Sequence, residues 1–413
     1  MERRNLIEID GKRLWSTVLR SSEIGPGKRG GMRRLALSDS DKIMRDQFVA
    51  WAKEAGCTVT VDQVGTIFAR RQGREDLPPV VIGSHLDTQI AGGRYDGVLG
   101  VLAGLEVIRT LNDRGIETKR PIEVASWTNE EGARFTPAMT ASGAFAGVYS
   151  VDYVHSLKDD DGFTFGAELK RTGYLGAAPV GGRPLDAYFE LHIEQGPILD
   201  RERMPVGIVT KGYASHGRLV ELFGENAHVG STPMDQRRNA LYGASLMVAA
   251  AHEIGWSRHA SEGKGNASRL VCTPNKFGII PDFAQVAIDV RHKDAAEAQK
   301  MAAELDRAIA DSAKKANVEA KVVAAWSFGN ERFDPELVGL LKGAASELGV
   351  PTREMMSQIG HDAYYVSRVA PTALIFTPCK DGISHNESEH TTLEDSVPGV
   401  NVLLNAVLAR ANR

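Results

Sequence analysis

The sequence predicts an α/β fold: a layered domain with a compact ferredoxin-like domain inserted into it. Apolar runs at residues 80–82, 122–127 and 187–191 have the length of strands and alternate with helical patterns, which is typical of layered α/β domains. Between residues 211 and 327 the order becomes strand, helix, strand, strand, helix, strand, which is the order of a ferredoxin-like sandwich. A chain of 413 residues is long enough for about two to three domains of ordinary size.

A β-α-β unit is predicted early in the first domain. Residues 98–111 have the apolar spacing of a helix, stop before Gly115 and lie between the first two strand runs. All three runs pass from apolar into polar residues, with His85, Asn129 and His192 at or just after their ends. Ligands of open α/β sheets bind at the carboxyl ends of the strands, so we expect a functional site there.

The predicted elements divide the chain into three segments. Residues 1–210 and 328–413 form the first domain, and residues 211–327 form the inserted domain. The inserted elements are predicted at residues 218–223, 238–254, 270–277, 283–290, 294–316 and 321–326. The chain then returns to the first domain with a helix after Pro335, a strand at 373–376 and a last helix at 397–409.

The composition excludes several classes of protein. Apolar residues make up 42% and charged residues 25% of the chain, close to the average of soluble proteins. The net charge of -4 supplies no basic face for nucleic acid. Cys57, Cys272 and Cys379 have no paired spacing, which indicates a reducing compartment rather than a disulfide framework. No apolar run approaches the length of about 18 residues that a membrane helix needs, so we predict a cytoplasmic protein without a membrane partner.

Histidine, aspartate and glutamate recur at the predicted strand ends and adjoining loops. Such residues lie in five segments: 83–87, 93–97, 129–132, 190–194 and 384–386. Each segment alone is a weak signal, since a single His-x-Asp is more often a hydrogen-bonded pair than a metal site. Together, imidazoles and carboxylates without thiolates suit zinc, manganese, cobalt or nickel.

Charge and geometry assign tasks to these groups. A carboxylate between two divalent ions can bridge them and offset their repulsion. Of the adjacent Glu130 and Glu131, one can ligate while the other acts as general base on an activated water. Asp87 can accept the second ring N–H of His85 and fix its tautomer. The residues therefore predict a metal-dependent hydrolase.

Five motifs, GSHLDTQ, GGRYDGVLGV, WTNEEGARF, ELHIEQGP and GISHNESE, occur in an order that resembles the co-catalytic dinuclear metallopeptidase and aminoacylase superfamily. The match, which spans nearly the whole chain, is to its amidase, hydantoinase and carbamoylase branch. That branch includes N-carbamoyl-L-amino-acid hydrolases, allantoate amidohydrolases and β-ureidopropionases. The resemblance implies a metallopeptidase-like catalytic domain, an inserted lid and dimerisation domain, and two divalent ions per subunit, zinc before manganese, cobalt or nickel.

The resemblance also implies the metal ligands. Three residues would hold each ion: His85, Asp96 and His192 for one, and Asp96, Glu131 and His385 for the other. Asp96 would bridge the ions and Glu130 would be the general base. His192 stands where many peptidases of the superfamily have a carboxylate, which favours the carbamoylase branch.

The inserted domain carries three residues that resemble substrate-holding elements of the branch. Arg291 would grip a substrate carboxylate, His228 would stabilise the oxyanion of the reaction intermediate, and Asn275 would hydrogen-bond to polar groups of the substrate. For Asn275 the neighbouring proline favours a plain turn as the alternative. The family also forms homodimers through this domain, and its histidine can complete the site of the neighbouring subunit.

Two further residues are expected at the substrate. Gln195 belongs to the ELHIEQGP motif, and His361 lies in the segment SQIGHD. For His361 and its neighbour Asp362 the alternative is a buried hydrogen-bonded pair. Gln358 and Ile359 replace small residues of the branch, so the pocket is expected to differ from that of better-known members.

The predicted activity is metal-dependent hydrolysis of the carbamoyl C–N bond of N-carbamoyl-L-amino acids, a small ureido or amide substrate with a carboxylate. Allantoate and N-carbamoyl-β-alanine offer the same groups and remain alternatives. An aminoacylase or dipeptidase is disfavoured by His192. A non-catalytic protein that only retains the fold is disfavoured because every ligand and the base are present.

Overall fold

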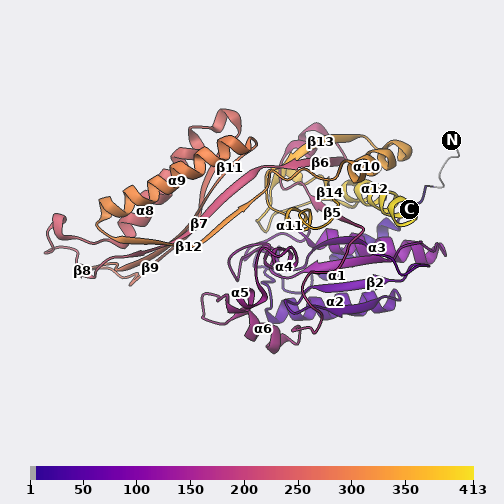
Figure 1. Cartoon of the computed structure of the whole chain (residues 1–413), viewed down its shortest axis with the longest axis horizontal. Coiled ribbons are helices and arrows are strands. Elements are labelled where there is room, and N and C mark those ends of the chain that lie inside the picture. The colour runs from indigo at the N-terminus through magenta and orange to yellow at the C-terminus, as the bar shows by residue number, and fades with distance from the viewer. Residues whose placement is uncertain (1–5) are drawn as a thin grey trace. The chain divides into compact units, whose positions relative to one another are not determined.

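The computed structural model describes residues 6–413, which form two compact units (Figure 1). One unit contains Met1–Thr210 and Arg332–Arg413, and the other contains Lys211–Glu331. The second unit therefore starts at the predicted position, and it ends at Glu331 where the prediction had residue 327. Among residues 6–413, no helix has both the length and the apolar character needed to cross a membrane.

The first unit is built on an eight-stranded sheet with the order β1-β2-β4-β3-β5-β14-β6-β13. Its strands are β1 (Thr58–Val61), β2 (Ile67–Arg71), β3 (Val80–His85), β4 (Ile122–Trp127), β5 (Ala187–Ile193), β6 (Val206–Gly212), β13 (Thr352–Ser357) and β14 (Thr372–Thr377). The central strands β4, β3, β5 and β14 run parallel, and every residue in them is buried. Burial on both faces explains why these strands are apolar runs without alternation.

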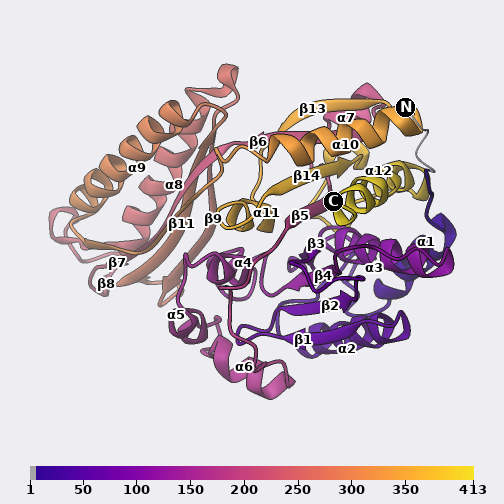
Figure 2. The same cartoon turned by 45° about the vertical axis from the view of Figure 1, so that its right-hand side comes forward.

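Helices cover this sheet (Figure 2). α3 packs on β3, β4 and β5, and α12 packs on β14 and β5, whereas α11 contacts β5 and β14. The helices of the unit are α1 (Gly11–Ser21), α2 (Asp39–Glu54), α3 (Val98–Asp113), α4 (Thr140–Phe145), α5 (Val151–Ser156), α6 (Phe165–Thr172), α7 (Ile198–Glu202), α10 (Pro335–Leu348), α11 (Asp362–Val366) and α12 (Leu393–Ala411). The predicted β-α-β unit is β3-α3-β4, with parallel strands.

The second unit is a four-stranded antiparallel sheet with the order β12-β7-β11-β9 and two helices. Along the chain its main elements are β7 (Ala214–Phe223), α8 (Ala240–Trp256), β9 (Lys264–Thr273), β11 (Phe283–His292), α9 (Ala295–Ala316) and β12 (Glu319–Phe328), and the short strands β8 (Ala227–His228) and β10 (Ile279–Ile280) pair with each other. Apolar side chains of β7, β11, α8 and α9 form its core. The elements follow the predicted order.

One strand of this unit was misplaced by the sequence. The prediction was 270–277, whereas β9 spans Lys264–Thr273. β9 lies at the edge of the sheet, and most of its side chains are exposed, so its first half, KGNASR, shows no apolar pattern. Pro274 has no N–H to donate to the ladder, which ends the strand there.

Gly97, which precedes α3, allows the helix to start directly beside His85. Its φ of 67° lies in the left-handed region, and a Cβ at this position would lie 2.3 Å from ring atoms of the His85 imidazole. Only glycine fits both the backbone conformation and this approach.

Replacing Gly97 by alanine is expected to displace the His85 ring. Gly115, past the end of α3, also has a positive φ of 59°, but a Cβ added there would have no neighbour within 4 Å, so Gly115→Ala is the matched control for backbone strain. After equilibration with zinc, elemental analysis should show apparent metal affinity at least about 10-fold weaker in Gly97→Ala and unchanged in Gly115→Ala. Equal metal content in the two variants would contradict this account.

Asp62 is a buried carboxylate in the turn between β1 and β2. It is 1% exposed, and its Oδ1 accepts hydrogen bonds from the N–H groups of Val64 (3.0 Å) and Thr66 (2.8 Å). Among residues 6–413 its Oδ2 has no hydrogen-bond partner. Burial raises the pKa of Asp62 from 3.8 to about 6, so the folded chain binds this proton more tightly than the unfolded chain.

Asp62→Asn should therefore stabilise the protein at pH 8 and have little effect near pH 4. Wild-type stability falls as the pH rises from about 4 to about 6, because the unfolded chain releases the proton first. The difference between the two pKa values corresponds to at most about 3 kcal/mol. Thermal unfolding at both pH values, with the exposed Asp161→Asn as control, measures the effect; an equal shift at the two pH values would refute it.

Candidate metal centre

The site lies at the carboxyl edge of the central strands. β3 ends at His85, β5 ends just after His192, and the two strands are parallel neighbours. Their imidazole ring centroids are 5.8 Å apart. The parallel register thus brings two histidines together that are far apart in the sequence.

Asp96 lies between two groups of possible ligands. One group is His85, Asp96 and His192, the other is Asp96, Glu131 and His385, and within each group the ligand atoms lie within 4.8 Å of one another. Oδ1 of Asp96 lies 3.1 Å from His192 Nε2 and 3.6 Å from His85 Nε2. Oδ2 lies 3.4 Å from His385 Nε2. The two oxygens of one carboxylate therefore face the two groups, as a bridging ligand requires.

Backbone hydrogen bonds orient two of the imidazoles. Nδ1 of His85 lies 2.9 Å from the main-chain oxygen of Asp87, and Nδ1 of His192 lies 2.9 Å from that of Ile193. Each Nδ1 therefore carries the hydrogen and donates it, which leaves the Nε2 lone pair of each ring directed toward Asp96.

Asp87 orients His85 through its main-chain oxygen, whereas the prediction assigned this hydrogen bond to its carboxylate. The chain turns after β3, so the carbonyl of Asp87 points back to His85, and its carboxylate reaches the loop after β4. There it accepts hydrogen bonds from the N–H groups of Glu130 and Glu131, both at 3.3 Å. Asp87 thus holds the two glutamates in place as well as orienting His85.

Three residues at the site have left-handed backbone conformations without being glycine. They are Asn129 (φ 58°), Gln195 (φ 55°) and His385 (φ 51°). Such conformations cost roughly 1–3 kcal/mol each and concentrate at functional sites. They lie after β4, after β5 and in the loop before α12. The side chains of Gln195 and His385 contact Asp96, whereas Asn129 donates to the main-chain oxygen of Phe135 within its own loop.

The charges of the group favour bound cations. Burial would raise the pKa of Asp96, but the neighbouring imidazole groups of His192, His385 and His85 outweigh this effect and hold that pKa well below its ordinary value. Burial lowers the pKa of His385, whereas Glu131 and Asp96 raise it to about 11. The cluster attracts positive charge, and its nitrogen and oxygen donors fit a pair of divalent ions such as zinc or manganese.

The adjacent glutamates have different surroundings. Glu131 accepts hydrogen bonds from the main-chain and side-chain N–H groups of Gln89, and its Oε2 lies 3.3 Å from His385 Nε2. Glu130 is buried with Oε2 3.5 Å from His85 Nε2. Burial raises the pKa of Glu130 well above its usual value, and the nearby charge of Asp362 adds to this effect. A carboxyl group with a raised pKa suits proton transfer near neutral pH.

His361 and Asp362 lie beside the ligands but do not pair with each other. The His361 ring packs on His192, with centroids 4.6 Å apart, and burial lowers its pKa well below 6.5. Asp362 accepts a hydrogen bond from the Ser142 hydroxyl. Within residues 6–413, His361 Nε2 and Asp362 Oδ2 have no hydrogen-bond partner. The alternative of a hydrogen-bonded pair is therefore not what the structure shows.

Gln195 contacts the ligand group directly. Its Nε2 donates one hydrogen to Asp96 Oδ2 and one to Ser384 Oγ, both at 2.8 Å. Glu389, which the sequence analysis missed, accepts hydrogen bonds from the N–H groups of Tyr95 and Asp96. The available signal was an acidic residue four positions after His385 in the motif GISHNESE.

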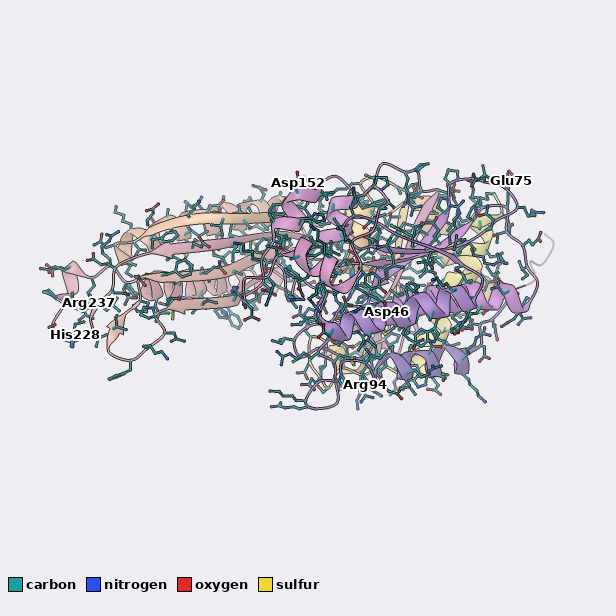
Figure 3. All side chains as sticks on the ribbon, turned by 90° about the horizontal axis from the view of Figure 1, so that it is seen from below. Asp46, Glu75, Arg94, Asp152, His228 and Arg237 are labelled. Atoms are coloured by element: carbon teal, nitrogen blue, oxygen red, sulfur yellow. The ribbon has the colours of Figure 1, made fainter. Side chains whose placement is uncertain are left out.

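The other predicted residues belong to the second unit. His228 is in β8 and exposed, and its Nδ1 accepts hydrogen bonds from the N–H groups of Gly230 (3.0 Å) and Ser231 (3.3 Å). The ring therefore carries its hydrogen on Nε2 and is a donor there. Asn275 is exposed in the loop after Pro274. Figure 3 shows His228 beyond the ends of the long strands of this unit.

Arg291 lies at the opposite end of the same sheet. It is paired with Ser215, near the start of β7, and Ser215 also pairs with Phe328 at the end of β12. At the other end of β11, Phe283 pairs with Phe223 and Thr273, the residues that lead to His228 and Asn275. Arg291 comes eight positions after Phe283, a length of about 26 Å along the strand. Within one chain, His228 and Asn275 follow strands at one end of the sheet, and Arg291 lies near the other end.

Comparisons with known proteins agree with this geometry. Residues 81–409 match peptidase family M20/M25/M40. An N-carbamoyl-L-amino-acid amidohydrolase of Rhizobium meliloti is 43% identical over 98% of this chain and 97% of its own length. A ureidoglycolate hydrolase of Arabidopsis thaliana is 30% identical over 96% of this chain and 86% of its own.

Among solved structures, an amidase of the hydantoinase/carbamoylase family from Burkholderia vietnamiensis is 47% identical, covers 100% of both chains and has a TM-score of 0.95. The matched range 81–409 includes every residue of the two ligand groups and also Glu130. The chain belongs to peptidase family M20/M25/M40.

Proposed function

We propose that the protein hydrolyses the carbamoyl C–N bond of N-carbamoyl-L-amino acids. The observation that carries the proposal is the position of Asp96, whose two oxygens face two separate ligand groups with Glu130 beside them. The relatives named N-carbamoyl-L-amino-acid amidohydrolase, one of them 43% identical, support the choice of substrate. The reaction consumes water and yields ammonia, carbon dioxide and the free amino acid.

Each ligand group would hold one divalent ion, zinc before manganese, cobalt or nickel. When bound, the ions lower the pKa of water and polarise the substrate carbonyl. Glu130 takes the proton from the attacking water, since its carboxylate is adjacent to the ligands without belonging to either group. The same carboxyl group then returns the proton to the leaving nitrogen.

Polar groups around the ligands are proposed to hold the substrate. Gln195 uses both amide hydrogens on Asp96 and Ser384, so its Oε1 is the atom that would accept a ureido N–H. His361 Nε2 is buried and has no partner among the described residues, which suits a contact with bound substrate. Arg291 would bind the carboxylate.

His228 and Asn275 are proposed to act in the site of a partner subunit. They follow strand ends that lie about 26 Å along the sheet from Arg291, farther than one amino-acid derivative can reach. A symmetric homodimer resolves this, because the second unit of one chain would supply His228 and Asn275 to the other chain. The Nε2 hydrogen of His228 would then donate to the oxyanion. This unit would serve as both lid and dimerisation domain.

Allantoate and N-carbamoyl-β-alanine remain alternative substrates with the same chemistry. The relative named ureidoglycolate hydrolase, which is 30% identical, supports a ureido substrate without favouring one of these compounds.

Ammonia release tests the proposed reaction. Purified protein loaded with zinc or manganese should release ammonia from N-carbamoyl-L-amino acids, and a chelator should abolish the release because the ligands act only through bound ions. Parallel reactions with allantoate, N-carbamoyl-β-alanine and N-acetyl amino acids identify the substrate class. No release from any ureido compound by metal-loaded protein would reject the proposal.

Mixing two inactive variants tests the shared site. Glu130→Gln lacks the base and His228→Ala lacks the oxyanion donor, so each alone should lose most turnover. If subunits of a symmetric dimer exchange freely, an equal mixture should recover about a quarter of wild-type activity, since half of the dimers then contain one intact site of two. If the mixture stays inactive although native mass spectrometry detects mixed dimers, His228 does not act across the interface.

A further inference from the structure

Glu389 is a buried carboxylate outside both ligand groups that binds the turn carrying Asp96. It is 4% exposed, and its Oε1 accepts hydrogen bonds from the N–H groups of Tyr95 (3.2 Å) and Asp96 (3.1 Å). A Cβ on Gly93 would lie 1.9 Å from the same oxygen. The carboxylate therefore lies directly against the backbone of this turn, which leaves no room for a side chain at position 93.

The other oxygen of Glu389 starts a chain of hydrogen bonds to the Asp96 side chain. Glu389 Oε2 accepts the hydrogen of the Ser384 hydroxyl at 2.7 Å. Because that hydrogen is used, Ser384 Oγ acts as acceptor for Gln195 Nε2 at 2.8 Å. The second hydrogen of Gln195 Nε2 then goes to Asp96 Oδ2, also at 2.8 Å.

The direction of donation follows from Glu389 acting as acceptor at both of its oxygens. An ionised carboxylate only accepts hydrogen bonds, whereas an amide at the same place can also donate. With an amide there, the Ser384 hydroxyl is able to turn its hydrogen toward Asp96 Oδ2, 3.4 Å away. The introduced amide and Gln195 Nε2 would then both donate to the two lone pairs of Ser384 Oγ, and Asp96 Oδ2 would face two competing donors, Gln195 Nε2 and the Ser384 hydroxyl, instead of one.

We propose that Glu389 is a positioning residue of the metal centre. It fixes the backbone of Asp96 through two N–H groups and the side chain of Asp96 through Ser384 and Gln195. The inference rests on the proposed function in one respect, namely that Asp96 bridges two ions. Groups that orient metal ligands from behind typically change metal affinity about 10- to 100-fold when replaced.

Glu387 provides a matched control in the same loop. Its Oε2 accepts hydrogen bonds from the N–H groups of Arg29 (2.5 Å) and Gly31 (3.2 Å), so it binds the glycine-rich loop near residue 30 and makes no hydrogen bond to the turn of Asp96. Glu387→Gln is the same chemical change two residues away. It separates the specific role of Glu389 from a general loss of loop order.

Metal titration tests the proposal without substrate. Wild type, Glu389→Gln and Glu387→Gln are stripped with a chelator, and zinc is titrated in competition with a chromogenic chelator. We expect the affinity for at least one ion to fall about 10- to 100-fold in Glu389→Gln and to stay at the wild-type value in Glu387→Gln. Ser384→Ala should weaken binding by less, and adding it to Glu389→Gln should have little further effect, since the two residues act through one chain.

Two results for the variants would overturn the proposal. One is wild-type affinity for both ions in Glu389→Gln. The other is weaker binding that is equal in Glu389→Gln and Glu387→Gln and that accompanies an equal fall in the Tm of the stripped proteins. A wild type that binds no metal would overturn both this role and the proposed function, whereas a wild type that binds two ions but releases no ammonia would reject only the proposed reaction.

Discussion

The buried carboxylate of Asp96 is the group on which the site depends. A carboxylate in the protein interior is costly unless charged or polar partners surround it, and the structure supplies His85, His192 and His385 together with the Gln195 amide. These partners come from β3, β5 and the loop before α12. The parallel pairing of β3, β5 and β14 brings the carboxyl ends of these strands to one edge of the sheet, where the site lies.

The same constraint explains the local conformations around Asp96. Three non-glycine residues adopt left-handed backbone angles, and Gly97 has no side chain because His85 occupies that space. Each feature is unfavourable or restrictive on its own. The central strands, buried on both faces, provide the apolar burial that offsets these costs.

The sequence predicted those parts of the molecule whose signal is local. β4 was found with its bounds because its six residues are all buried, and the five motifs located the ligands that the structure groups around Asp96. β9 began six residues earlier than predicted because an exposed edge strand has no apolar pattern. Two features could not be read from the sequence because they depend on how distant loops meet in space. His85 is oriented by the main-chain oxygen of Asp87 and not by its carboxylate, and Glu389 binds the turn that carries Asp96. The roles of the predicted substrate residues remain predictions.

The order of the segments along the chain has a consequence for synthesis. The second unit is one continuous stretch, Lys211–Glu331, whereas the first is completed only by Arg332–Arg413. β14, a central strand beside β5, and His385 both come from this last part. On a ribosome the inserted unit can therefore fold first. The sheet of the first unit stays incomplete until β13 and β14 have been synthesised. The second ligand group is complete only after His385 has been synthesised, so a chain that stops before Arg332 would carry an unsatisfied acidic cluster and an open sheet edge.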